Sequence, residues 1–501
     1  MSLYSEDDSK LLDERIEDIL KEADVVSSKL VEPTKDKVWE IIYIVRDFVI
    51  EKKRKIYGGF ALNKLIEQIE PKDKFYDDDN VDSWDIDFYS PDPISDAKEI
   101  ANRLYGKGFR HIVAREAQHD ETYKVFAETK DCADITYVPR NIYNKMPFKE
   151  VNGMQLTGPH FLMIDYFRVL TDPLTSYVIR LQKTFDRLCL MVKHYPLPYN
   201  TSSIDIVPPD RDLDVAFHTV HEFLTNRQST ITVGLYAYNH LIRESGISEE
   251  KKKNKIDYID INYYEVISTE YKSDARDLIL KLKEKFSVSP DRVTYQENYP
   301  FFQYLGYSVN IYFDEEIICR MYNYNSRCTP YFDVPALYFK KSSYDDNEGT
   351  IRIGSFATLM MYNLIDIMKA RTDNDQNTKN LYYTVISHIT DMKKYYFEKT
   401  KKTIFDDSLF KEFILRCAGN TMTPQMEKTI RMDKKKKAGK RYAWNYAPEN
   451  DKGRESDVRY IFKNSSGNPI RNEKNKKISL TESQSTDNDV DNIEDEDENE
   501  N

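Results

Sequence analysis

The strongest constraint on the fold of this chain is an internal repeat. YGGFALNKLI (57–66) aligns without gaps to VGLYAYNHLI (233–242), DIDFY (85–89) matches DINYY (260–264), and SDAKEIANRL (95–104) matches SDARDLILKL (273–282). The helical segments MIDYFRVL and MMYNLIDIM follow in their respective copies. Four matches in one order and at nearly one spacing predict a tandem duplication of a single structural unit. Two such units suit a chain of 501 residues, which is too long for one ordinary core.

Each copy mixes helical and strand patterns. In the first copy the apolar spacing predicts helices over 7–30, 36–54, 95–105 and 161–193, the last interrupted at Asp172-Pro173, and another helix from Gly58 to about Ile69. Strands are predicted at WDIDFYS and over 123–129 and 132–138, and in the second copy over 307–313 and 317–322. We therefore expect an α+β fold in which each unit is a mixed sheet flanked by helices.

The charge distribution divides the rest of the chain. Residues 391–480 contain 23 Lys and Arg and 12 Asp and Glu, whereas residues 481–501 contain ten Asp and Glu and no Lys or Arg. We expect an N-terminal helical segment (1–35), a first domain (36–200), a second domain with C-terminal helices (201–425), a basic flexible segment (426–480) and a disordered acidic tail (481–501).

The cysteines and the apolar segments indicate a cellular compartment. The five cysteines include no CxxC pair and are odd in number, so we expect free thiols in a reducing, intracellular setting. No run of 18 apolar residues predicts a membrane span, and the acidic N-terminus lacks the pattern of a signal peptide.

Three features of the first copy suit phosphoryl transfer. Gly58 and Gly59 open a helix, where backbone amides and the helix dipole favour phosphate and glycine allows close approach. Asp85 and Asp87 share one face of the next strand, and Asp134 lies on another strand. Three carboxylates can bind two divalent cations about 4 Å apart. Each feature alone is common by chance, so the prediction of phosphoryl transfer rests on their combination.

That combination resembles a known superfamily. Gly-Gly before a helix, then D-h-D and a distant h-D-h (h, apolar), resembles the DNA polymerase beta-like nucleotidyltransferases. YGGFALNKLI, followed by a long insertion and WDIDFYS, is more narrowly similar to the poly(A) polymerase catalytic subunits of poxviruses and giant viruses. The resemblance implies a template-independent enzyme that adds AMP from ATP to RNA 3′ ends, with two Mg²⁺ or Mn²⁺ ions.

The resemblance also implies roles for individual residues. Asp85, Asp87 and Asp134 would bind metal, and Asp134 would help to position or deprotonate the RNA 3′-hydroxyl. Gly58 and Gly59 would contact the nucleotide phosphates. Phe60 stands where many superfamily members have Ser, so we expect backbone amides to make the contact there.

Two groups of basic residues are candidates for binding nucleotide or RNA. Along helix 161–193 lie Arg168, Arg180, Lys183 and Arg187, of which the last three share one face; the alternative is a solvated face. A later run without helical or strand patterning, next to Tyr442, Trp444 and Tyr446, suits RNA contact, with a linker or a localisation signal as alternatives; it contains Lys434, Lys435, Lys436, Lys437, Lys440 and Arg441.

The second copy lacks several of these residues. Gly59 corresponds to Leu235 and Asp87 to Asn262, and no carboxylate stands near Ile318, where we expect the equivalent of Asp134. We therefore predict that the first copy is catalytic and that the second is degenerate.

Two other functions stay open at this point. One is a terminal uridylyltransferase or another nucleotidyltransferase, because no short motif reports base selectivity. The other is a non-catalytic RNA-binding scaffold. The resemblance implies a single-stranded RNA 3′ end and ATP as partners, together with either a homodimer or a separate processivity subunit. It places such a protein in the host cytoplasm, in viral factories, and in the virion.

Overall fold

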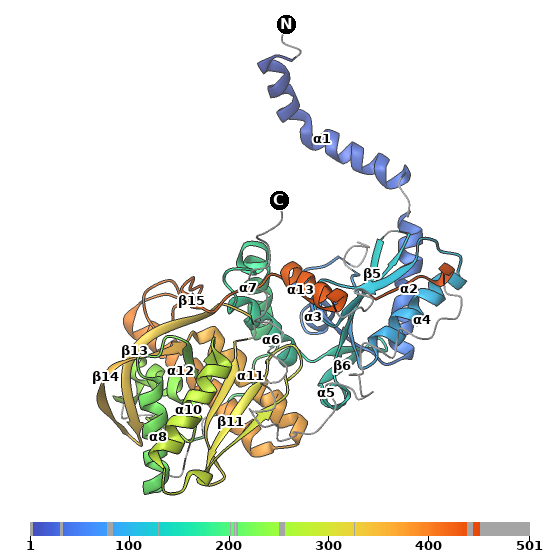
Figure 1. Ribbon diagram of the computed structural model, residues 1–501. Coiled ribbons are helices and arrows are strands. Elements are labelled where there is room, and N and C mark those ends of the chain that lie inside the picture. The colour runs from blue at the N-terminus through green and yellow to red at the C-terminus, as the bar shows by residue number, and fades with distance from the viewer. Residues whose placement is uncertain are drawn as a thin grey trace, which may run out of the picture. The chain divides into compact units, whose positions relative to one another are not determined.

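The computed structural model describes residues 4–30, 34–77, 84–128, 130–200, 202–204, 206, 209–249, 256–324, 326–437 and 444–450. The chain divides into two compact units, and neither is continuous in sequence (Figure 1). The first unit contains the described residues up to Val138, then Phe148–Thr157 and the residues from Pro424 on; the second contains Pro139–Pro147 and Gly158–Thr423.

The first unit is a sheet covered by helices. Its strands run in the order β16-β3-β4-β5-β2-β1-β7-β6. They are β1 (Lys55–Tyr57), β2 (Asp87–Ser90), β3 (Val113–Glu116), β4 (Thr122–Ala127), β5 (Lys130–Tyr137), β6 (Phe148–Val151), β7 (Met154–Thr157) and β16 (Asn445–Tyr446). The helices are α1 (Glu6–Leu30), α2 (Lys35–Glu51), α3 (Gly58–Glu67), α4 (Pro93–Gly106) and α13 (Pro424–Lys437), with 3₁₀ turns at Pro71–Asp73 and Pro448–Asn450.

Helix α2 illustrates how the sequence builds this core. Thr34 caps its N-terminus by accepting a hydrogen bond from the Lys37 amide. Its apolar residues recur at helical spacing and are buried, and Phe48 lies 6.1 Å from Phe88 of β2, centroid to centroid. Helices α2 and α4 contact each other and both contact β5, so they cover one face of the sheet.

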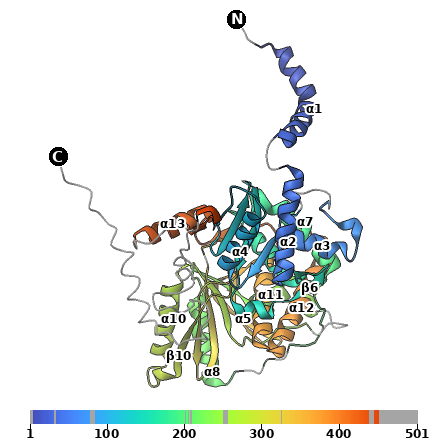
Figure 2. The ribbon, with the colours of Figure 1, turned by 90° about the vertical axis from the view of Figure 1, so that its right-hand side faces the viewer.

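The second unit repeats this plan. Its strands run in the order β10-β11-β12-β9-β8-β14-β13-β15. They are β8 (Thr230–Val233), β9 (Tyr264–Ser268), β10 (Val293–Asn298), β11 (Ser308–Phe313), β12 (Glu316–Asn323), β13 (Thr329–Lys340), β14 (Ser343–Gly354) and β15 (Cys417–Ala418). Helices α8 and α10 pack together on this sheet (Figure 2). The helices are α5 (Arg140–Lys145), α6 (Pro159–Leu170), α7 (Tyr177–His194), α8 (Arg211–Leu224), α9 (Gly234–Ser245), α10 (Tyr271–Lys285), α11 (Phe356–Asp373) and α12 (Gln376–Thr400), with 3₁₀ turns at Ile247–Glu249 and Pro290–Arg292.

The strand orders establish the duplication. Apart from the edge strands β16 and β15, the series β3-β4-β5-β2-β1-β7-β6 matches β10-β11-β12-β9-β8-β14-β13 strand for strand. Buried ion pairs repeat as well. Arg54 Nε lies 2.7 Å from Asp96 Oδ2 in the first unit, and Arg227 Nε lies 2.7 Å from Asp274 Oδ1 in the second. The predicted tandem α+β duplication is confirmed.

The register of the second copy differs from our sequence alignment. Tyr57 pairs with Asp87 in the first sheet, and the equivalent Val233 pairs with Glu265 in the second. The counterpart of Asp87 is therefore Glu265, and our assignment of Asn262 was wrong. Helix α9 has 12 residues where α3 has 10, and our sequence alignment did not allow for this difference in length.

The same register corrects the third position. Asp87 pairs with Asp134 across parallel strands, and Glu265 pairs with Arg320. Arg320, two residues from Ile318, therefore stands where the first unit has Asp134, and the prediction that this position carries no carboxylate is confirmed.

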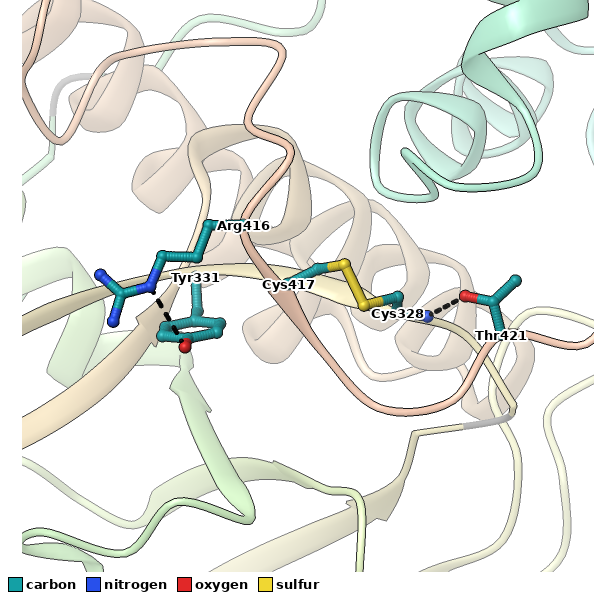
Figure 3. The surroundings of a disulfide bond; sticks show 5 residues. All are labelled: Cys328, Tyr331, Arg416, Cys417 and Thr421. Carbon is teal, nitrogen blue, oxygen red and sulfur yellow. Dashed lines mark hydrogen bonds between the residues drawn. A yellow bond between two sulfur atoms is a disulfide. The ribbon is translucent and has the colours of Figure 1, made fainter.

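One disulfide contradicts the prediction of free thiols. Cys328 and Cys417 are bonded, with their Cα atoms 5.2 Å apart and a sequence separation of 89 residues (Figure 3). Pairing of Pro330 with Cys417 between β13 and β15 brings these distant segments together. Nearby, the Cys328 amide donates to Thr421 Oγ1 at 2.9 Å. Cys132, Cys189 and Cys319 are free thiols.

None of the described helices combines the length and the hydropathy that crossing a membrane requires.

Candidate active site

The site begins where β1 meets α3. Gly58 adopts a φ of +75°, and a Cβ on it would lie 2.7 Å from Asp87 Oδ2. Any other residue would therefore be strained and would displace the carboxylate. No side chain caps α3, so the amides of its first turn are not used by a capping residue. Glycine thus brings the N-terminus of α3 next to a carboxylate.

The three predicted carboxylates gather beside this turn. Asp87 opens β2 and is the direct neighbour of Asp134 on the parallel strand β5. Asp85 precedes the strand and is exposed, whereas Asp87 is half-buried and Ile86 between them is buried. The strand begins three residues later than expected, but the alternation that separates the two aspartates from Ile86 is as predicted.

Sequence reasoning missed two further charged residues. Lys124 of β4 forms an ion pair with Asp131 and another with Asp134, the latter at 2.8 Å. Both aspartates reach one lysine because β5 has a bulge: Val125 pairs with Ala133, but Phe126 pairs with Asp131. A bulge leaves no simple period in the sequence, so strict alternation could not have grouped Asp131 with Asp134.

The electrostatics reflect crowded negative charge. Burial, followed by the charges of Asp85 and Asp134, holds the pKa of Asp87 well above its usual range. Burial also raises the pKa of Asp134 to about 6, although Lys124 opposes the shift. Burial lowers the pKa of Lys124, but its hydrogen bonds to Asp131 and Asp134 outweigh this and leave that pKa raised.

The carboxylates suit a divalent cation by their chemistry. Mg²⁺ and Mn²⁺ prefer carboxylate oxygens, and mutual repulsion at Asp87 is the condition that a bound cation relieves. Within the described residues, however, no three Asp, Glu, His or Cys side chains already converge on one metal position. The Lys124 ammonium, which contacts Asp134, partly fills the role of a counter-charge here.

The remaining predicted nucleotide contacts are distributed over both units. Phe60 of α3 is 3% exposed and packs against Trp84, so its side chain belongs to the core. Arg168 of α6 lies 3.0 Å from Asp165. This helix and α7, which carries Arg180, Lys183 and Arg187, belong to the second unit.

The basic C-terminal run is more ordered than its sequence pattern predicted. Lys434–Lys437 form the last turn of α13, and Lys435 Nζ lies 2.8 Å from Glu116 Oε1. The expectation of no helical structure is wrong for these residues, and ion pairs of Arg431 with Asp120 and of Lys435 with Glu116 connect the helix to the first unit. Lys440, Arg441 and Tyr442 lie outside the described residues, as does the acidic tail.

The aromatic residues after this run have structural partners. Trp444 is 5% exposed and packs edge-on against Tyr123, and β16 extends the first sheet by pairing with β3. Tyr446 donates from its hydroxyl to Asn102 Oδ1 at 2.6 Å. Trp444 is thus a core residue rather than a platform for bases.

In the second unit, the position equivalent to the carboxylate cluster is occupied by charged side chains that pair with one another. Arg320 lies 3.6 Å from Glu265 and 4.0 Å from Asp366, and Lys369 lies 3.4 Å from Asp366. Burial and Asp366 raise the pKa of Glu265 to about 7, although Arg320 and Lys369 oppose the shift. The second unit therefore carries a built-in guanidinium at the position where the first unit has Asp134.

Comparison with known families extends over nearly the whole chain. Residues 43–176 match the family model "Poly(A) polymerase catalytic subunit", and residues 191–479 match the model "APMV, Putative poly(A) polymerase, catalytic subunit, C-terminal". Among curated proteins, the "Putative poly(A) polymerase catalytic subunit" of Acanthamoeba polyphaga mimivirus is 31% identical over 499 residues, covering 93% of this chain and 83% of that protein.

Two other relatives are similar. The protein of the same name from African swine fever virus (strain Badajoz 1971 Vero-adapted) is 29% identical over 160 residues, covering 31% of this chain and 33% of its own. The crystal structure of the Megavirus polyadenylate synthase superposes with a TM-score of 0.78 at 31% identity, covering 94% of this chain and 93% of that one.

Proposed function

Because the chain belongs to the viral poly(A) polymerase catalytic subunits, we propose that its first unit carries the adenylyl transfer and that Asp85, Asp87, Asp134 and the Gly58-Gly59 turn perform it. The enzyme class is polynucleotide adenylyltransferase. The observation that carries the proposal is the approach of Gly58 to Asp87, which sets the N-terminus of a helix beside a carboxylate cluster.

In the reaction, the RNA 3′-oxygen attacks the α-phosphorus of ATP, and the bond to pyrophosphate breaks. Backbone amides of Gly58 and Gly59 bind the triphosphate at the positive end of α3. Asp85, Asp87 and Asp134 would hold Mg²⁺ or Mn²⁺. When bound, these ions neutralise the phosphate oxygens and activate the hydroxyl. Asp134 positions the 3′-hydroxyl and accepts its proton.

Lys124 supports this arrangement from the neighbouring strand. Its ammonium contacts Asp131 and Asp134, and therefore fixes the side chain that faces the hydroxyl. RNA is held by positive charge elsewhere: the end of α13, and α7 with Arg180, Lys183 and Arg187. Phosphate contacts of this kind bind RNA without reading its bases.

The test is nucleotide addition to a labelled RNA primer, with each of the four NTPs supplied separately. Asp85→Ala and Asp87→Ala should each lower AMP addition by about 10³-fold or more, since each removes a charged group from the reacting centre. Glu265→Gln is the matched control, because it changes the counterpart of Asp87 in the second unit.

The outcomes separate the candidate functions. Addition of AMP alone, lost in both alanine variants and kept in the control, supports the proposal. Preferential use of UTP would identify a uridylyltransferase. Near-wild-type extension by a folded Asp85→Ala, Asp87→Ala double variant would remove these two residues from the catalytic assignment. No addition by the wild type with any of the four NTPs would leave RNA binding as the activity.

A further inference from the structure

A small cavity opens in the second unit. It has a volume of about 130 Å³ and lies where residues 257–260 meet the turn between β13 and β14. The polar side chains that line it include Ser203, Tyr258, Asp260 and Ser342. Tyr238, also in the lining, donates or accepts a hydrogen bond with His388 Nδ1 at 2.8 Å and is therefore already partnered.

Asp260 is the unusual member of this lining. It is only 8% exposed, and its Oδ1 accepts the Lys341 amide at 3.0 Å. Its Oδ2 is buried, and none of the residues that the structure describes forms a hydrogen bond with it. A buried carboxylate oxygen without a donor is costly, and such groups in native proteins point to a missing partner. The missing partner must bring an N–H or O–H donor into the cavity.

The register shows that Asp260 is not a remnant of the catalytic carboxylates. Because Glu265 is the counterpart of Asp87, the position equivalent to Asp85 is Tyr263, and Asp260 precedes it by three residues. The described residues also offer no cluster of three metal-binding side chains at this cavity. A metal ion is therefore a poor occupant, and an organic donor fits better.

The cavity has room for one ring of a base. Its volume of about 130 Å³ compares with about 150 Å³ for apolar cavities that bind benzene, and because it is open to solvent the rest of a larger base can stay outside. The half-exposed Tyr258 ring, which also lines the cavity and stacks on Phe339 at 5.6 Å, offers an aromatic surface there. Carboxylates accept hydrogen bonds from the exocyclic amines of bases, and aromatic side chains stack on unpaired bases.

We propose that this cavity of the second unit binds an adenine base of the RNA tail, whose 6-amino group donates to Asp260 Oδ2. The inference rests on the proposed function, since it is the product of that reaction that supplies unpaired adenines in series. The degenerate unit would then have a binding function: this cavity binds a base of the tail, whereas the basic helices bind its phosphates. Uracil has no exocyclic amine, and its ring N3–H lies between two carbonyl oxygens that a carboxylate repels, so the site distinguishes A-rich from U-rich RNA.

The experiment measures binding of short fluorescent oligonucleotides by anisotropy, with wild type and Asp260→Asn. The asparagine keeps an oxygen for the Lys341 amide and turns the orphan acceptor into a donor that faces the amine. Affinity for oligo(A) should fall by about 10-fold or more, as for a hydrogen bond to a charged group. Affinity for oligo(U) should not change by more than about 2-fold.

A chemical variant of the ligand isolates the amine. An oligonucleotide of purine riboside, which lacks the 6-amino group, should bind wild type more weakly than oligo(A), and Asp260→Asn should cause no further loss. The charge control is Asp346→Asn, which removes an exposed carboxylate from the β13–β14 hairpin. It should bind oligo(A) as wild type does. Binding of free ATP and AMP is measured as well, to distinguish a site for a base of the tail from a site for a free nucleotide.

Each outcome decides the question. Equal losses for oligo(A), oligo(U) and the purine oligonucleotide would overturn the proposal, because they would reflect charge or fold rather than the amine. Tight binding of AMP with no response of oligo(A) would make the site one for a free nucleotide, and the tail would not be its ligand. A fall in melting temperature in Asp260→Asn would indicate a structural role; we expect no fall, since the substitution removes a buried unpartnered charge. The proposed function fails separately, through Asp85 and Asp87.

Discussion

At the residue scale, the geometry of the reacting centre depends on Gly58, because its lack of a Cβ leaves room for the Asp87 carboxylate. Gly58 has a positive φ and lies against Asp87, so Gly58→Ala introduces backbone strain and pushes the carboxylate aside. A displacement of about 1 Å at a reacting centre can cost about 10²-fold in rate. We expect a loss of AMP addition of that order, measured as kcat/KM per folded enzyme.

The duplication supplies a matched control for this variant. Gly234 also has a positive φ, of 62°, and its Cβ would clash with Glu265 Oε2. Gly234→Ala should therefore destabilise the chain to a similar degree while it leaves AMP addition unchanged below the melting temperature. Equal loss of activity in the two variants would mean that the second unit contributes to the reaction.

Glu265 makes the stability of the second unit depend on pH. Its pKa is raised from 4.5 to about 7 in the folded chain, so between these values the native state holds a proton that the unfolded state has lost. The free energy of unfolding must then fall as pH rises through this window, by at most about 1.4 kcal/mol per pH unit. Glu265→Gln removes this dependence.

Denaturant unfolding at pH 5, 6, 7 and 8 measures this effect. The stability of Glu265→Gln relative to wild type should improve steadily from pH 5 to pH 7 and then level off. Glu348→Gln, an exposed change on the β13–β14 hairpin, is the control. Parallel curves for wild type and Glu265→Gln would show that the carboxyl titrates normally in the fold.

The sequence predicted the residues of the site better than their surroundings. The Gly-Gly pair and the D-h-D pattern carry their geometry locally, because a helix start and a strand face follow from spacing of a few residues. Lys124 and Asp131 depend on a bulge and on pairing between strands, which no local period records. The counterpart Glu265 was recoverable: the match of SDAKEIANRL with SDARDLILKL carries the register that the strands adopt, whereas the match of DIDFY with DINYY does not.

At the scale of elements, α13 has two different faces. Lys435 contacts Glu116 of the first unit, whereas Lys434, Lys436 and Lys437 are exposed at the end of the helix. The sequence predicted the charge of this element but missed its helical structure. The reason is that its lysines give no apolar period, and its contacts are ion pairs with Asp120 and Glu116, which lie far away in the chain.

Changing Lys434, Lys436 and Lys437 to Gln should weaken RNA binding and reduce its salt dependence. Each lost phosphate contact lowers the slope of log affinity against log salt by about 0.7 for single strands. The measurement is primer affinity over a salt series, together with tail length. A triple change of the exposed Lys394, Lys399 and Lys401 near the end of α12 is the control. If both variants lose the same slope, the effect is one of net charge and α13 is not on the RNA path.

At the scale of the whole molecule, the two units share one fold but differ in charge at one equivalent position, where the first has Asp134 and the second has Arg320. In the first unit, Asp87 and Asp134 are neighbours and repel each other, a state that a bound cation relieves. In the second, Glu265 has Arg320 as its neighbour, so the positive charge comes from an arginine side chain. A site that already contains its own counter-charge gains little by binding a metal ion.

This asymmetry predicts the number of metal-dependent nucleotide sites. Equilibrium dialysis with a non-hydrolysable ATP analogue, with Mn²⁺ or with a chelator, should show that Mn²⁺ adds one bound nucleotide per chain and not two. Asp87→Asn should abolish that increment, because it removes a ligand from the centre in which Lys124 pairs with Asp131 and Asp134 and leaves the repulsion at Asp87 for a bound cation to relieve. Glu265→Gln should keep it, since Arg320 still occupies the second centre. Nucleotide bound equally with and without Mn²⁺ reports on other sites, such as the cavity at Asp260, and does not enter the count. An increment of two nucleotides, or one that is lost in Glu265→Gln, would show that the second unit binds metal and nucleotide despite its guanidinium, and both copies would then have to be treated as working centres.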